Sequence, residues 1–178
     1  MVTQEILKNL LLQTDRFYLR PLTKKDASVR YLSWMADTVI NKYIESAKYT
    51  NNLKSLESFV MEKSNKSDCL FLGIFLRQSH LHIGNIKYEP INFRSGYAVM
   101  GVMIGDINWR GKNVFSEVLK NTTEWLKKEF NINQIQLGVE KKNISAIKAY
   151  EKLGFTLCKE SSNIKSNPNA LKMKLLID

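Results

Sequence analysis

The order of the apolar segments in the middle of the chain constrains its fold more than any other feature. Three strand-like runs, at 69–76, 81–89 and 96–106, follow one another with only brief turns between them. A helical pattern at 113–130 then separates the third run from a fourth, at 132–140. Brief turns join antiparallel neighbours, whereas a strand–helix–strand connection joins parallel ones. One sheet must therefore contain both kinds of pairing, and ligand sites favour the carboxyl ends of its parallel strands.

Signals on either side of this region complete the pattern. "DRFYLRPL", residues 15–22, alternates as a half-buried strand, and "TKKD", residues 23–26, predicts the start of a helix that continues through Trp34. Gly101, inside the third strand-like run, predicts a bulge or a close backbone approach. The other expected elements are helices at 53–63 and 143–153 and strands at 155–160 and 170–177.

The length and composition indicate a single domain. The chain has 178 residues, of which 44% are hydrophobic and 25% charged, which suits one substantial core. We therefore assign residues 1–178 to one domain, in which residues 1–11 form a short amphipathic leader. The sequence contains no apolar run near the ~20 residues that cross a bilayer, and no secretory signal pattern. We expect a cytoplasmic protein that does not enter a membrane.

The cysteines and histidines do not predict a metal site. Cys69 and Cys158 lie far apart, each in an apolar stretch, and neither belongs to a Cys-x-x-Cys pair. His80 and His82 are the only histidines, too few for a histidine-based cluster. We interpret both cysteines as reduced packing residues and predict no metal cofactor.

The net charge of +10 leaves two readings open. One is a solvated, lysine-rich surface, and the other is an anionic partner such as nucleic acid, a membrane surface or a polyphosphate cofactor. The positive charge is not gathered into an arginine tract or into a basic helix with interleaved aromatic residues. A basic nucleic-acid-binding domain is therefore kept only as an alternative.

"IGDINWRGKNVFSEVL", residues 104–119, reads as a strand end, a loop and the start of a helix. Amides at a helix start point outward without acceptors inside the helix, and the helix dipole adds partial positive charge there. With Arg110 and Lys112 beside it, such a loop can seat a pyrophosphate. The bare pattern fits equally well an ordinary loop in which Gly111 makes a turn.

"NISAIKAYEKLGF", residues 143–155, has the punctuation of a surface helix. Asn143 is expected to cap its start, and Gly154 to end it. Composition alone favours core or rim packing for the tyrosine midway, Tyr150.

Taken together, "WRGKNVFSEVL" and "VEKKNISAIKAYEKLGF" resemble the GCN5-related N-acetyltransferase (GNAT) superfamily. "LQTDRFYLRPLTKKDA" is similar to the start of its ribosomal-protein N-terminal acetyltransferase branch, so the resemblance covers residues 12–178. The resemblance implies the acyl-CoA N-acyltransferase fold, an α+β (α/β/α) arrangement. Its mixed, mostly antiparallel seven-stranded sheet is flanked by about four helices. Acetyl-CoA is the implied co-substrate, without a metal, and an amine is the implied acceptor.

The resemblance also implies where acetyl-CoA binds. The sheet should splay between its fourth and fifth strands, here 97–104 and 132–140. The pantetheine arm would enter the splay, pair with the backbone of Met103 and Ile104, and meet Asn143. The pyrophosphate would lie on the amides of five consecutive residues: Arg110, Gly111, Lys112, Asn113 and Val114.

Two residues of this loop depart from the family's usual Q/R-x-x-G-x-G/A pattern. Asn113 and Phe115 stand where small glycines are common. Asn113 is tolerable because asparagine enters the left-handed backbone region more readily than most residues. Phe115 would crowd a phosphate unless its ring points into the core, which we predict. The alternative function is a non-catalytic module of the same fold, which binds acyl-CoA without turnover.

The resemblance assigns the main chemical role to Tyr150, whose hydroxyl would protonate the departing thiolate as a general acid. Some family members carry a glutamate as base five residues before the motif's asparagine, where this chain has Gly138. The candidates for the base are Glu140, Glu89, Asp106 or a water chain, and none is assigned.

The acceptor pocket implied by the resemblance comprises residues 29–48 and 161–168. Aromatic residues in or next to these segments can stack on a sugar or peptide, or they can belong to the core: Tyr31, Trp34, Tyr43 and Tyr49. The scarcity of acidic residues there favours a neutral or anionic acceptor over a polyamine. An amino sugar and a protein N-terminus both remain possible acceptors, and a monomer and a homodimer are both compatible with the sequence.

Overall fold

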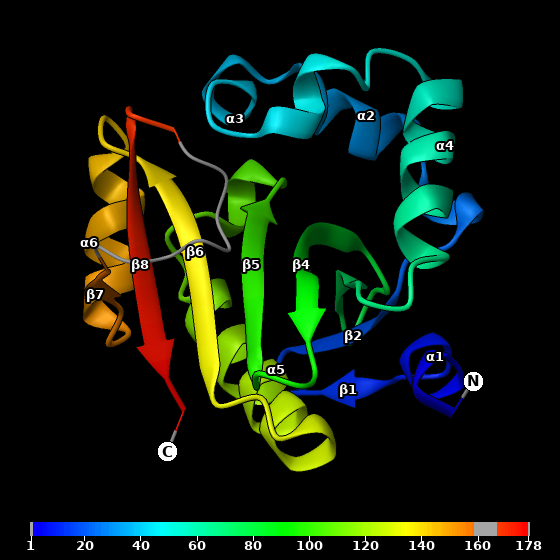
Figure 1. The fold of residues 1–178 in the computed structure, drawn as a ribbon. Coiled ribbons are helices and arrows are strands. Elements are labelled where there is room, and N and C mark those ends of the chain that lie inside the picture. Colours follow the sequence, from blue (N-terminus) through cyan, green and yellow to red (C-terminus); the bar gives the residue numbers. More distant parts are fainter. Residues whose placement is uncertain (1, 159–166, 178) are drawn as a thin grey trace.

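An eight-stranded mixed sheet in the order β1-β2-β3-β4-β5-β6-β8-β7 organises the molecule (Figure 1). The structure is a computed structural model that describes residues 2–158 and 167–177. The strands are β1 (Leu12–Gln13), β2 (Phe17–Pro21), β3 (Leu70–Leu76), β4 (His82–Asn92), β5 (Tyr97–Ile104), β6 (Gln134–Glu140), β7 (Thr156–Leu157) and β8 (Ala170–Leu176).

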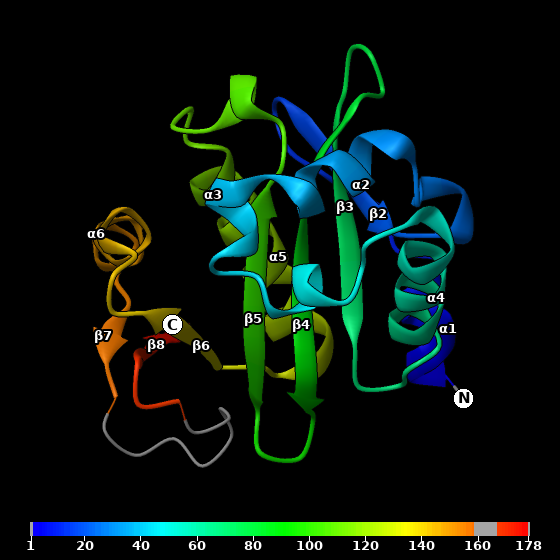
Figure 2. The same ribbon diagram turned by 90° about the horizontal axis from the view of Figure 1, so that it is seen from above.

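The helices lie on both faces of this sheet (Figure 2). The α-helices are α1 (Val2–Lys8), α2 (Val29–Ala36), α3 (Thr38–Asn41), α4 (Leu53–Ser64), α5 (Val114–Phe130) and α6 (Ile144–Lys152). The described residues also form three short 3-10 helices: η1 (Lys24–Asp26) between β2 and α2, η2 (Glu45–Lys48) between α3 and α4, and η3 (Ile107–Trp109) between β5 and α5.

Two hydrophobic clusters divide the core between the two faces. The larger cluster packs the apolar side of α5, represented by Val118 and Leu126, against strand residues such as Ile135. The smaller cluster packs α2 and α4, through Tyr31 and Leu56, against the opposite face. The middle of the sheet is therefore covered on both sides, which explains the nearly continuous apolar sequence of β3.

Among the strands of the described residues, β5 and β6 are the only parallel neighbours, and they pair over a short stretch. Cα partners run from Tyr97 with Gln134 to Val99 with Gln136, after which β5 continues alongside β4 and β6 alongside β8. Figure 1 shows the two strands diverging from this point. The mixed, mostly antiparallel sheet and the splay between 97–104 and 132–140 are thus confirmed.

The strand and helix counts differ slightly from the expected seven and four. Leu12 and Gln13 pair with Leu19 and Tyr18, which adds the short edge strand β1. The N-terminal stretch expected to be a leader forms α1, and Leu7 in it is buried in the larger core cluster. The predicted strand at 155–160 is described only as far as residue 158, because residues 159–166 lie outside the described part of the chain.

Two local expectations need correction. The capping signal predicted from "TKKD" is present, since Asp26 accepts a hydrogen bond from the Thr23 amide, but it opens a 3-10 turn rather than the helix that contains Trp34. The α-helix starts later, capped by Ser28. Gly101 pairs in regular register with Lys87, and no bulge occurs there. No described atom outside its immediate neighbours lies within 4 Å of a Cβ placed at Gly101, so its α-carbon faces open space.

Candidate active site

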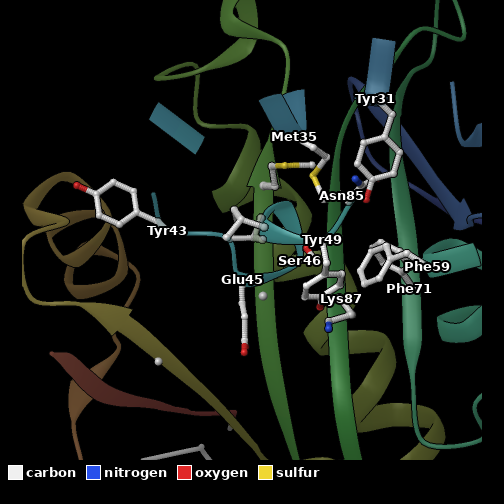
Figure 3. Close-up of a pocket in the computed structure, with 15 residues that line it drawn as sticks. Tyr31, Met35, Tyr43, Glu45, Ser46, Tyr49, Phe59, Phe71, Asn85 and Lys87 are labelled. Carbon is white, nitrogen blue, oxygen red and sulfur yellow. The ribbon is translucent and has the colours of Figure 1, made fainter. Parts of the chain in front are cut away.

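The splay between β5 and β6 opens into a cavity of about 300 Å³ (Figure 3). Its strand side is formed by Gly101, Val102 and Met103 of β5 and by Gly138 of β6. Since Gly101 and Gly138 carry no side chains, the backbone of both diverging strands is accessible from the cavity. This is the place at which a ligand can reach strand amides that no neighbouring strand uses.

The rest of the lining comes from α2, α4, η2 and the segments around η2, and from strands β3 and β4. Aromatic side chains make up much of this lining: Tyr31, Tyr43, Tyr49, Phe59 and Phe71. The expected acceptor aromatics Tyr31, Tyr43 and Tyr49 are therefore brought together. Trp34 is not among the described lining residues. Its ring instead covers Gly105, where an added Cβ would lie 2.0 Å from the indole.

Two residues of the loop after β5 have a left-handed backbone. Gly111 and Asn113 both have a positive φ, of 72° and 57°, a conformation found in anion-binding backbone turns. The first helical hydrogen bond of α5 runs from the Glu117 amide to the Asn113 carbonyl, so the amides of residues 114–116 have no acceptor inside the helix. Asn113 adopts the left-handed conformation that asparagine tolerates better than most residues.

The charged side chains of the loop point to neighbouring protein groups. Arg110 donates from Nε to the Ile104 carbonyl at 3.0 Å and from Nη2 to Asp37 Oδ2 at 2.8 Å. Hydrogen bonding to this guanidinium lowers the pKa of Asp37. The Arg110 amide also donates to the Ile107 carbonyl at 3.3 Å. The Lys112 ammonium lies 5.4 Å from the Trp109 ring. Arg110 therefore clamps the loop to the end of β5.

Met103 and Ile104 lie on opposite faces of β5. Met103 is buried in the smaller cluster beneath α2, whereas Ile104 packs against the larger cluster on the α5 side. Their side chains therefore serve the two core layers, and only their backbone faces the splay. Pairing of that backbone with a pantetheine arm stays a prediction.

Asn143 caps α6 as predicted, accepting a hydrogen bond from the Ala146 amide at 3.3 Å. Tyr150, two turns further along α6, is half-buried, and its ring meets the edge of the Phe115 ring at a centroid distance of 5.5 Å. Phe115 packs against the larger core cluster, so its predicted inward orientation is confirmed. Burial raises the pKa of Tyr150 to about 12, so its hydroxyl keeps its proton at neutral pH.

Two of the three candidate bases are engaged in structural contacts. Burial alone would raise the pKa of Glu89, but hydrogen bonds from Lys66, Lys87 and Lys63 lower it to about 2, which makes this carboxylate a very weak base. Asp106 is buried, pairs with Arg30 and accepts from the Asn108 amide.

Glu140, the third candidate, is half-buried and accepts from Asn167 Nδ2 at 3.1 Å. It borders a larger groove that shares Glu45 and Gly138 with the cavity. Glu45 was missed by the sequence reasoning because nothing in its local pattern marks it. It is exposed on η2, and Figure 3 shows its side chain extending from the cavity lining.

Asn85 and His82 were also missed. Both lie on β4, and Asn85 reaches the cavity, where it is 3% exposed. The available signal was a polar residue inside an otherwise buried strand, since β4 is buried from Ile83 to Ile86.

The remaining candidates for special chemistry have ordinary roles. In residues 2–158 and 167–177, no group of three or more His, Cys, Asp or Glu side chains is arranged to hold a metal ion. Burial raises the pKa of the Cys69 thiol to about 12, consistent with a packing role. None of the helices in the described residues is both long enough and apolar enough to cross a membrane.

Comparison with known proteins agrees with this geometry. The family model described as an acetyltransferase (GNAT) domain matches residues 16–156. An acetyltransferase of the GNAT family from Bacillus anthracis superposes with a TM-score of 0.76 at 17% identity, covering 94% of this chain and 98% of that one. A ribosomal-protein-S5-alanine acetyltransferase from Vibrio fischeri gives a TM-score of 0.73 at 15% identity, covering 96% and 98%.

A third solved structure, a microcin C7 self-immunity acetyltransferase in complex with acetyl-CoA and AMP, has a TM-score of 0.76 at 17% identity, covering 92% of this chain and 93% of that one. At such identities these structures establish the fold, whereas the family match extends over most of the sequence. Because that match includes both the loop at the start of α5 and the helix that carries Tyr150, the chain belongs to the GNAT acetyltransferase family and is an acetyl-CoA-dependent N-acetyltransferase.

Proposed function

We propose that the cavity beside the splay receives a primary amine, from a small molecule such as an amino sugar or from a protein N-terminus, and that the amine attacks the thioester directly. The observation that carries this proposal is the position of the cavity. It joins the exposed backbone of β5 and β6 on one side to an aromatic chamber on the other. Two reactants can therefore approach from different directions and meet at the splay.

The chain offers backbone groups to hold acetyl-CoA. Met103 and Ile104 would pair with the pantetheine arm, and the amides from Gly111 to Val114 would face the pyrophosphate. Arg110 contributes through its side chain, which holds this loop against Ile104 and Gly105. Asn143 uses its Oδ1 as the helix cap, which leaves its Nδ2 to meet the arm. A backbone amide of β5 would stabilise the charge that develops on the thioester oxygen.

Tyr150 would act as the general acid. Its raised pKa keeps the phenol protonated at neutral pH, as a donor to a departing thiolate must be. The Phe115 and Phe155 rings lie 5.5 and 5.6 Å from the Tyr150 ring and restrict its orientation.

The amine must lose a proton before it attacks. We assign this proton to Glu45, a carboxylate on the described cavity lining that is also in contact with solvent. Neither Glu89 nor Asp106 is a described lining residue of this cavity, and hydrogen bonds from three lysines lower the pKa of Glu89 to about 2. Glu140 borders only the adjoining groove.

Two measurements test the proposed function. Acetyl-CoA should raise the melting temperature of the protein, because it binds the folded state. Free thiol should then appear in the presence of amines, in a panel of amino sugars, peptide N-termini and polyamines. Thermal stabilisation without thiol release from any amine would instead support the acyl-CoA-binding module. Crowding of the phosphate by Phe115 was a main reason to consider this alternative. Because Phe115 packs against the core, that reason is weakened.

The proposal also covers the domain organisation, the location and the partners of the protein. The whole chain would act as one domain in the cytoplasm, as a monomer or homodimer, without nucleic acid. Salt-dependent retention of DNA or RNA would contradict the last point.

A further inference from the structure

Asn85 places an unpaired hydrogen-bond donor inside the acceptor cavity. Its side chain lines the cavity and is 3% exposed, and its Nδ2 has no partner within the described residues. A buried amide without a partner is unfavourable and uncommon in folded proteins. Figure 3 shows the Asn85 and Tyr31 side chains turned into the same cavity. A ligand that accepts a hydrogen bond there would satisfy this group.

His82 determines which end of the Asn85 amide faces the cavity. The His82 Nε2 atom lies 3.0 Å from the Gly84 carbonyl oxygen and 2.8 Å from Asn85 Oδ1. A carbonyl oxygen can only accept, so Nε2 carries the hydrogen and shares it between these two oxygens. The Asn85 oxygen is thereby occupied, and its NH₂ group is left to face the cavity.

The His82 ring itself is held by its neighbours. It stacks on Phe75 at a centroid distance of 4.8 Å and meets the edge of Trp34 at 5.0 Å. Burial lowers the pKa of His82, so the ring is neutral at physiological pH. His82 is therefore a positioning residue, which acts on a ligand only through Asn85.

The position of Asn85 relates it to the reacting centre. Asn85 is the Cα partner of Met103, so it lies one strand, about 5 Å, inward from β5 at the splay. A group bound at Nδ2 is therefore a few covalent bonds from an amine that attacks at the edge of β5. The amine itself is excluded as the partner, because an ammonium has no lone pair and a neutral amine needs its lone pair for the attack.

We propose that Asn85 Nδ2 binds a neutral oxygen, hydroxyl or carbonyl, that the acceptor carries a few bonds from its amine. This rests on the proposed function and specifies its substrate class. Most of the surrounding lining is aromatic or apolar, and Lys87 Nζ is already bound to Glu89 Oε2 at 2.7 Å. Lys87 is the one cationic side chain among the described lining residues, and its ion pair with Glu89 disfavours its use by an anionic oxygen. Hydroxylated ring amines and α-amino carbonyl compounds share the required chemistry.

The test compares pairs of amines that differ only in this oxygen. For the hydroxyl source the pair is trans-2-aminocyclohexanol and cyclohexylamine, and for the carbonyl source it is 1-amino-3-phenylpropan-2-one and 3-phenylpropylamine. The wild-type protein should favour the oxygenated member of at least one pair by roughly tenfold or more in kcat/KM, because its partner leaves Nδ2 unpaired. The pair that shows the preference identifies whether the bound oxygen belongs to a hydroxyl or to a carbonyl group. A ratio near one for both pairs overturns the proposal.

Asn85→Leu removes the donor with little change in volume and should bring the ratio to about one, with acetyl-CoA affinity unchanged. The matched control is Asn121→Leu, which also removes a buried unpaired polar atom, Oδ1 of Asn121, but on α5 and away from the cavity. The control should keep the wild-type ratio. Asn85→Asp, which retains the oxygen that faces His82, replaces Asn85→Leu if the latter does not fold. An unchanged ratio in the Asn85 variant overturns the proposal.

A binding measurement separates this inference from the proposed function. The NMR signals of the Asn85 side-chain amide should shift when an oxygenated amine is added and should remain in place with its deoxy partner, whether or not turnover occurs. A shift without thiol release from any amine would support the Asn85 site and contradict the proposed catalysis. Thiol release without any shift of the Asn85 signals would contradict the Asn85 site and support the proposed catalysis.

Discussion

The Phe115 and Tyr150 rings meet edge to face, with their centroids 5.5 Å apart and their planes at 86°. Phe115 belongs to the first turn of α5, and Tyr150 to α6. The contact therefore links the helix start proposed to hold the pyrophosphate to the residue proposed to protonate the thiolate. From the sequence, Phe115 could have crowded the phosphate. In the structure its ring instead packs against the proposed general acid.

Tyr150→Phe should lower kcat by roughly 10²-fold or more, because it removes only the proton donor. The ring and its packing on Phe115 remain, so stability and acetyl-CoA affinity should change little. Thiol-release kinetics and calorimetric titration with acetyl-CoA measure the two quantities. Equal kcat in the two proteins would remove the catalytic role of Tyr150.

Glu45→Gln should lower turnover at neutral pH, since it removes the carboxylate assigned to take the amine's proton. The loss should shrink as the pH rises toward the pKa of the free amine, where the acceptor is already deprotonated. A pH profile of kcat/KM for the variant and the wild type measures this. Glu140→Gln is the matched control and should keep the wild-type profile, and an equal effect in both variants would argue against Glu45.

Asn113→Ala should weaken acetyl-CoA binding, because alanine tolerates the left-handed backbone of the loop poorly, and Asn113→Gly should preserve it. Asn131 provides a matched control, with a φ of 54° against 57° for Asn113, at the far end of α5. Both alanine variants should lose about 1 kcal/mol of stability. Only Asn113→Ala should raise the Kd for acetyl-CoA, measured by titration.

Gly101→Val should leave the fold intact and impair activity. A Cβ at Gly101 meets no described atom within 4 Å beyond its neighbours, and valine favours a strand, so the side chain would project into the cavity. Thermal unfolding should show an unchanged or higher melting temperature, while kcat/KM falls. Gly84→Val is the contrasting variant and should be destabilised, since its Cβ would clash with the Met103 carbonyl oxygen. Full activity in Gly101→Val would place the reaction elsewhere.

Glu89→Gln should destabilise the protein by about 3 kcal/mol at neutral pH, because it leaves three lysines clustered without their shared carboxylate. The folded-state pKa of Glu89, about 2, lies below the ordinary 4.5, so its contribution is complete above pH 4.5 and is lost as the pH falls toward 2. Denaturant unfolding at several pH values should show the wild type and variant converging in acid. Glu62→Gln, in the same lysine cluster but exposed, should change stability little.

Several features of the site were predictable because they depend on neighbours in the sequence. The cap at Asn143 and the left-handed Asn113 each follow from a single residue type next to a helix start. The splay followed from the family resemblance together with the strand–helix–strand order. The pairing of Asp26 with Arg20 was not predicted, because Arg20 belongs to the preceding strand and the contact forms between two elements.

The sequence by itself determined the kinds of element, their order and the family, since hydrophobic periodicity, caps and motif spacing are local properties of the chain. Only the tertiary structure decided which carboxylates are neutralised, which asparagine is left with an unpaired amide and which ring supports Tyr150. Those properties depend on contacts such as those of Lys63 with Glu89 and of Phe115 with Tyr150, which form between elements far apart in the sequence. Burial and charge pairing arise only when such elements pack, and they select the chemistry of a site from residues that look ordinary in the chain.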